Sequence, residues 1–180
     1  MKSGKKNCPA ETDLPEIFND EYFMRAALRE AEKAERDNEV PIGAVAVKDG
    51  MVIARAWNQV ELLKDATAHA EMLALTQAEA VVGDWRLTGC TLYVTKEPCS
   101  MCAGASVLTR VTRVVFGAPD PKGGAAGGVM NLLQFPTLNH RCAITAGVRE
   151  NECRGMLQQF FAEQRAKSQK IGRASCRERV

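Results

Sequence analysis

The chain has 180 residues, of which 46% are hydrophobic and 26% charged, and its formal net charge is +2. This length and composition are typical of one globular domain with a sizeable core. No apolar run is long enough to span a bilayer, and no apolar stretch follows the basic N-terminus, so we expect a cytoplasmic protein. Only one pair among the seven cysteines has a recognisable spacing, which favours free thiols in a reduced compartment over a disulfide framework.

The two ends of the chain differ from the rest. Residues 1–18 lack periodicity, and we expect a mobile extension there. The tail spans 168–180, and its last ten residues, 171–180, match the translation of a common sequencing-library adapter in one frame. We interpret those ten residues as non-native read-through. They hold three arginines and one glutamate, so without them the net charge falls to zero. Nucleic-acid binding would therefore need a local basic patch.

Helical and strand patterns alternate between these ends. In chain order we expect a helix at 20–37, strands at 42–47 and 51–57, a polar loop at 58–65, a helix at 68–82, a strand at 90–95, a helix from 98, a strand at 111–117, a loop at 118–128, a short helix at 131–134, a strand at 143–148 and a helix at 150–167. Asn19 or Asp20 can cap the first helix and Thr67 the second. Pro98 suits the first position of the third helix.

The pattern predicts an α/β sandwich with a central sheet, because helices alternate with strands. Asp49-Gly50 predicts a two-residue hairpin turn between the first two strands, since both central residues of a type I′ turn need positive φ. Those two strands are therefore antiparallel, and the sheet is expected to be mixed.

Two short motifs carry the chemistry. One is His69-Ala70-Glu71 and the other is Pro98-Cys99-Ser100-Met101-Cys102. One imidazole and two thiolates can hold a zinc ion and leave its fourth position open for water, whose pKa the metal lowers to about 7. Glu71 is placed to move protons between that water and a substrate. A three-ligand zinc site with a carboxylate that is not a ligand is typical of the nucleobase deaminases.

A closed structural zinc site is the alternative, and it would need a fourth protein ligand. His140 lies in a polar stretch where a surface or capping role is favoured. Cys90 lies at the far end of its strand from Cys99. No fourth ligand is therefore evident, although short motifs of this kind can also arise by chance.

The sequence resembles the bacterial tRNA-specific adenosine deaminases, within the cytidine deaminase-like zinc deaminase superfamily. The matching stretches are 39–45, 57–58, 66–71, 91–105, 114–118, 124–127, 139–141 and 160–161. The resemblance covers roughly residues 20 to 167, a single domain's length, so we expect a zinc deaminase domain at 19–167. Ala66 and Pro119 depart from the family pattern, in which proline and arginine are common at these positions.

The resemblance implies a three-layer α/β sandwich with a five-stranded mixed sheet and a homodimer. It implies hydrolysis of adenosine to inosine at the wobble position of a tRNA anticodon, with a tRNA anticodon stem-loop as partner. His69, Cys99 and Cys102 match the ligands of one Zn²⁺ per subunit, and Glu71 matches the proton shuttle. The positions that match substrate contacts are Pro41, Ile42, Asn58, Asp120, Phe160, Phe161 and Arg165.

Other interpretations stay open at this point. Asn58 and Asp120 could serve turns, Phe160 and Phe161 could belong to the core, and Arg165 could simply solvate a helix end. The zinc motif also fits a deaminase of a free base, nucleoside or nucleotide of the cytosine or guanine type. A zinc-stabilised RNA-binding protein without activity is a third candidate, which Glu71 disfavours because a structural site has no use for it.

Overall fold

The computed structural model describes residues 18–177, with side chains up to residue 167. The expected extension before Phe18 and the side chains of the tail 168–180 lie outside the described residues. Five strands form one sheet in the order β2-β1-β3-β4-β5. The strands are β1 Gly43–Lys48, β2 Met51–Trp57, β3 Cys90–Lys96, β4 Arg113–Ala118 and β5 Ala143–Thr145. β1 pairs antiparallel with β2 and β3, whereas β3, β4 and β5 run parallel. The prediction of a mixed sheet is confirmed.

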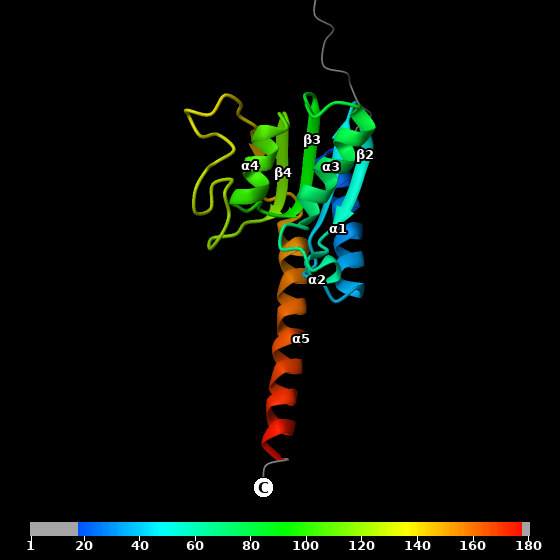
Figure 1. Cartoon of the computed structure of the whole chain (residues 1–180), viewed down its shortest axis with the longest axis vertical. Helices are drawn as coiled ribbons and strands as arrows, with labels where there is room; N and C mark the ends of the chain where they lie inside the picture. Colours follow the sequence, from blue (N-terminus) through cyan, green and yellow to red (C-terminus); the bar gives the residue numbers. More distant parts are fainter. Residues whose placement is uncertain (1–17, 178–180) are drawn as a thin grey trace, which may run out of the picture.

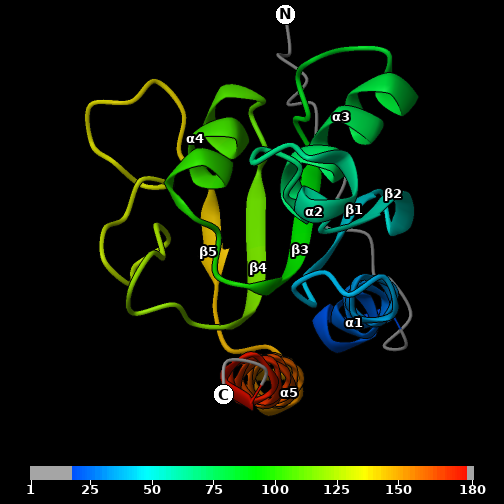
Figure 2. The same ribbon diagram turned by 60° about the horizontal axis from the view of Figure 1, so that its bottom comes forward.

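Helices cover both faces of this sheet, which makes the predicted three layers (Figure 2). α3 (Ala70–Val82) and α4 (Ser100–Leu108) lie on one face, and α1 (Asp20–Arg36) and α5 (Glu150–Arg177) on the other. Figure 1 shows α5 running away from the sheet as one long helix. Among the described residues, none of these helices has the length and apolarity that crossing a membrane requires.

Side chains alternate along the central strands, so each strand contributes side chains to the hydrophobic cores on both faces of the sheet. On β3, Leu92 and Val94 point into the layer beneath α3 and α4, whereas Tyr93 points toward α1. Alanine supplies much of the first layer, including Ala70, Ala74 and Ala78 on successive turns of α3, each with no exposed surface. These small side chains allow α3 to pack close to the sheet.

Two local predictions are confirmed in detail. Asn19 caps α1, because its side chain accepts a hydrogen bond from the Tyr22 backbone N–H at 3.0 Å. Asp49 and Gly50 both have positive φ, 50° and 72°, and they join Lys48 to its partner Met51. The hairpin turn therefore has the expected type I′ character.

Several predicted boundaries are wrong. The stretch expected to be a loop at 58–65 contains the single-turn helix α2, Val60–Leu63, which is too short for a periodicity signal. No helix forms at 131–134, where the Asn131 side chain closes a single turn by accepting from the Gln134 N–H. β5 ends at Thr145, before Gly147 with its φ of 81°. α5 continues past the expected end at residue 167 to Arg177.

The two helices that carry the chemical motifs begin later than predicted. α3 begins at Ala70 with His69 as its N-cap residue. Thr67, the predicted cap, donates its N–H and its hydroxyl to the Asp65 carboxylate and therefore does not cap the helix. α4 begins at Ser100 with Cys99 as its N-cap residue, so Pro98 precedes the helix. His69 and Cys99 therefore lie just outside their helices.

Candidate active site

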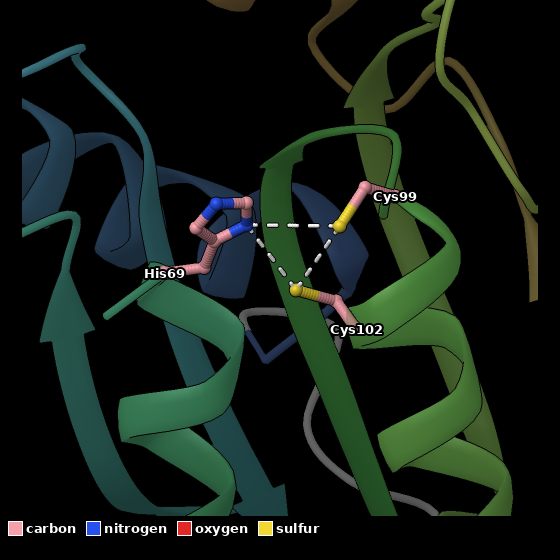
Figure 3. Close-up of side chains that lie close together, drawn as sticks. All are labelled: His69, Cys99 and Cys102. Carbon is pink, nitrogen blue, oxygen red and sulfur yellow. Dashed lines mark hydrogen bonds between the residues drawn. The ribbon is translucent and has the colours of Figure 1, made fainter. Parts of the chain in front are cut away.

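Three side chains converge where α3 and α4 begin, beside the carboxyl end of β3 (Figure 3). His69 and Cys99 are both N-cap residues with extended backbone, at φ/ψ of −71°/150° and −72°/175°. Cys102 is the third residue of α4, so its thiol faces the same point as that of Cys99. The positive ends of two helix dipoles therefore meet at this cluster and favour negatively charged sulfur.

The three potential ligand atoms form a compact triangle. Nδ1 of His69 lies 3.7 Å from Sγ of Cys99 and 3.5 Å from Sγ of Cys102, and the two sulfurs are 3.6 Å apart. Among the described residues, this is the one group of His, Cys, Asp and Glu side chains close enough to hold a metal ion together. The structure thus brings together the three residues that the sequence proposed as ligands.

His69, Cys99 and Cys102 are joined to one another by hydrogen bonds. Hydrogen bonds from the Cys102 thiol and from His69 lower the pKa of Cys99 to about 3. The hydrogen bond to Cys99 raises the pKa of Cys102, and burial acts in the same direction. The pKa of His69 is raised by its hydrogen bond with Cys99. A bound metal cation would replace these shared protons, because metal-bound thiolate and imidazole are deprotonated.

Glu71 lies beside the triangle but is not a member of it. It is the second residue of α3 and its side chain is 4% exposed. Burial raises the pKa of Glu71, although the charge of His69 opposes the shift. A raised pKa makes this carboxyl group a stronger base, which suits a residue that accepts a proton and then releases it, as general acid–base catalysis requires.

A cavity of about 600 Å³ opens next to His69. Its lining includes three residues that the resemblance proposed for substrate binding, Ile42, Asn58 and Phe160. Asn58 is 5% exposed and Phe160 7% exposed, so both are held in the wall rather than on the surface. The lining therefore combines apolar with polar side chains, as small-molecule binding sites do.

The other predicted contact residues do not line this cavity. Pro41 is buried and is absent from the cavity lining. Asp120 is held in an ion pair with Lys96 and accepts a hydrogen bond from the Lys122 backbone N–H at 3.0 Å. Phe161, 45% exposed, and Arg165 lie on the outer surface of α5. His140 is bonded to the Val111 carbonyl oxygen, a structural contact away from the ligand triangle.

Two buried carboxylates at the site were missed from the sequence. Glu39, 1% exposed, accepts hydrogen bonds from the Asn58 amide at 3.0 Å and from the Leu62 N–H at 2.6 Å. Glu97, also 1% exposed, accepts three backbone N–H groups from the loop at 120–128. The signal for Glu97 was its place directly after a buried strand and before Pro98-Cys99. The glycines of the facing loop were a second signal, because a Cβ at Gly124 would overlap its carboxyl group.

Comparison with known proteins places this site in a family. Residues 18–165 match the profile of the MafB19-like deaminases. A tRNA-specific adenosine deaminase of Bacillus subtilis (strain 168) is 56% identical over 151 residues, which cover 84% of this chain and 94% of the relative. The chain belongs to the tRNA-specific adenosine deaminase family. The resemblance inferred from the sequence is confirmed.

Further relatives agree with this assignment of the deaminase. A tRNA-specific adenosine deaminase of Aquifex aeolicus (strain VF5) is 54% identical over 121 residues, covering 67% of this chain and 80% of the relative. A solved structure from a study of A-to-I editing by tRNA:A34 deaminases at the wobble position has a TM-score of 0.73 and 46% identity, covering 76% of this chain and 99% of that one. The predicted fold class is confirmed by this structure.

Proposed function

We propose that the chain catalyses hydrolytic deamination of adenosine to inosine at the wobble position of a tRNA anticodon. The observation that carries the proposal is the ligand triangle with a buried carboxylate beside it, Glu71, which is not one of the three ligands, and a cavity that opens at His69. The family supports the substrate, since relatives at 56% and 54% identity are named as tRNA-specific adenosine deaminases.

We propose zinc as the metal. Tetrahedral zinc with ordinary bond lengths requires about 3.8 Å between two sulfur ligands and about 3.6 Å between sulfur and nitrogen. The observed separations of 3.6 Å between the sulfurs and 3.5–3.7 Å to the imidazole fit that geometry closely. When bound, zinc would polarise water and make it nucleophilic near neutral pH. The three-ligand set favours this use over a closed structural site, which normally has four protein ligands.

The residues of the chain supply the remaining chemistry. Glu71 would carry one proton of the attacking water to the ring nitrogen, where the product keeps it. It would carry the second proton, from the new hydroxyl group, to the departing amine, so that ammonia leaves and a carbonyl remains. Ile42 and Phe160 would enclose the base and exclude water. Asn58 would hydrogen-bond to the base, because its amide is anchored on Glu39 and faces the cavity.

The remaining expectations belong to the same proposal. The partner would be a tRNA anticodon stem-loop in the cytoplasm, and the enzyme would act as a homodimer. Asp120, Phe161 and Arg165 lie outside the cavity lining, so we assign any RNA contacts they make to nucleotides around the target rather than to the base itself.

The decisive experiment uses the full chain loaded with zinc. It is incubated with an anticodon stem-loop that carries adenosine at the wobble position, and inosine is measured by mass spectrometry of the digested RNA. Free adenosine, cytidine and guanine are run in parallel. Inosine from the stem-loop supports the proposal, whereas turnover of a free base or nucleoside alone would refute it. Tight RNA binding without turnover would indicate a protein that only binds RNA.

Glu71→Ala tests the proton shuttle separately. The variant should keep its zinc, because Glu71 is not a ligand, and should lose roughly 10²–10⁴-fold in kcat. Glu79→Ala, near the other end of the same helix, is the matched control and should retain activity. Full activity in the Glu71 variant would exclude the shuttle role.

A deaminase of free guanine is the second candidate. A guanine deaminase of Bacillus subtilis has 33% identity and a TM-score of 0.55, covering 69% of this chain and 83% of that one. The cavity volume of about 600 Å³ also accommodates a free purine. The guanine arm of the assay distinguishes this candidate from the first.

A further inference from the structure

The cavity beside the ligand triangle has an unfavourable charge for RNA. The ionisable side chains among the described residues that line it are Asp37, Glu39, Glu61 and the ligand His69, and no lysine or arginine lines it. An RNA substrate brings one negative phosphate with every nucleotide, and protein cations normally neutralise these charges. A cation near the site would offset the repulsion between the acidic lining and the phosphates that flank the target.

Lys96 has the position that this role requires. It is the last residue of β3, and it shares a side of the strand with Leu92 and Val94 because side chains alternate. That side faces α3 and α4, which begin at the ligand triangle. The charge of Lys96 also reaches His69, where it acts to lower the pKa of the imidazole.

The surroundings of Lys96 hold its ammonium group in place without burying it. Lys96 donates to one carboxylate oxygen of Asp120, and the other oxygen accepts from the Lys122 backbone N–H. The Asp120 N–H is bonded in turn to the buried Glu97 at 2.8 Å. The Lys96 side chain nevertheless remains 28% exposed. An ammonium group has three N–H donors, so one can bind Asp120 while others bind a ligand.

We propose that Lys96 binds the RNA backbone phosphate adjacent to the target nucleotide, with Asp120 positioning its ammonium group. The inference rests on the proposed function for its substrate class. It assigns Asp120 an indirect role, because its carboxylate is already committed to Lys96 and to the loop at 120–123.

Equilibrium binding tests this contact independently of turnover. The affinity of a fluorescently labelled anticodon stem-loop is measured by anisotropy between 50 and 200 mM salt, with zinc-loaded full chain in the Glu71→Ala background. Lys96→Met should weaken binding about tenfold at low salt, as expected for loss of a charge-assisted hydrogen bond. It should also lower the slope of log affinity against log salt by about one. Lys96→Arg should restore most of that slope.

Lys48→Met is the matched control, because Lys48 ends β1 beside the hairpin turn and pairs with Cys90, at the opposite end of β3 from Lys96. It should leave the salt slope unchanged. Zinc content and melting temperature show that each variant is folded. An unchanged slope in the Lys96→Met variant, or an equal change in the Lys48→Met variant, would overturn the proposal, as would absence of stem-loop binding by the chain. Binding with the predicted slopes, together with no inosine from the unaltered chain in the turnover assay, would instead refute only the proposed function.

Discussion

Replacing Glu97 with glutamine should destabilise the enzyme far more than the loss of one charge on a protein surface. The carboxylate is 1% exposed and connects β3 to the loop that follows β4. Oε2 accepts from the Asp120 N–H at 2.8 Å, and Oε1 accepts from the N–H groups of Ala126 and Gly128 at 3.0 and 2.8 Å. A carboxylate can satisfy all three donors because both of its oxygens are acceptors.

A glutamine side chain has the same shape but only one acceptor oxygen. If that oxygen stays on Ala126 and Gly128, the amide nitrogen faces the Asp120 N–H, donor against donor. A buried donor without a partner costs about 1–3 kcal/mol. For a chain of this size, such a loss corresponds to a fall in melting temperature of about 2–12 °C. Alanine would leave three donors unsatisfied, about 3–9 kcal/mol, which is comparable with the stability of a whole domain.

Urea unfolding of the zinc-loaded chain, followed by circular dichroism, measures this effect. Glu61→Gln is the control, because Glu61 is 75% exposed and its ion pair with Lys64 lies in solvent. We expect the control to change the free energy of unfolding by less than about 0.5 kcal/mol. If Glu97→Gln matched the control, the three hydrogen bonds would contribute nothing net, and the account of the loop anchor would be wrong.

Three further outcomes are expected. Gly43→Ala should abolish cooperative thermal unfolding, because a Cβ there would overlap a backbone carbonyl oxygen of α1; a normal melting curve would contradict the packing of α1 on β1. Although burial acts to raise it, hydrogen bonds from Arg113 help to hold the pKa of Asp20 below its usual value. The stabilisation from Asp20 is thus complete above the usual carboxyl pKa and lost as the pH falls, so Asp20→Asn should show a smaller loss of stability in acid than the unaltered chain. Finally, Glu39→Gln and Asn58→Ala should be non-additive in kcat/KM, with a coupling of about 0.5–3 kcal/mol, because Glu39 acts through the Asn58 amide; additive effects would refute that link.

The ligand triangle could be predicted from the sequence because each of its two parts is a short motif with a recognisable chemistry, although His69 lies 30 positions before Cys99. Cys99 and Cys102 are one helical turn apart, and His69 precedes a helix of its own. The alternation of helices and strands then predicts that both helix starts lie at one edge of the sheet. The exact first residue of each helix was not predictable, because it depends on which side chain captures which backbone group. The Asp65 side chain accepts hydrogen bonds from the N–H and the hydroxyl of Thr67, so Thr67 does not cap the helix and His69 becomes the N-cap residue.

The supporting carboxylates were not predictable for a different reason. Glu39 binds groups 19 and 23 positions away, and Glu97 binds groups 23 to 31 positions away. Nothing in the residues around Glu39 shows that this acid is buried. The residues around Glu97 hint at burial, because it follows a buried strand, but they do not identify its hydrogen-bond partners. The ion pair of Lys96 with Asp120, across 24 positions, is equally invisible in the sequence. Tertiary contacts of this kind decide which polar residues face the cavity.

The buried alanines of α3 affect the geometry of the metal site through the packing of the core. Ala70, Ala74 and Ala78 set how close this helix lies to the sheet, and therefore where the imidazole at its start meets the two sulfurs. A few added methyl groups would lift the helix and spread the triangle before they unfolded the domain. The absorption spectrum of bound cobalt(II) responds to coordination geometry, so it would report a change in the distance between α3 and the sheet.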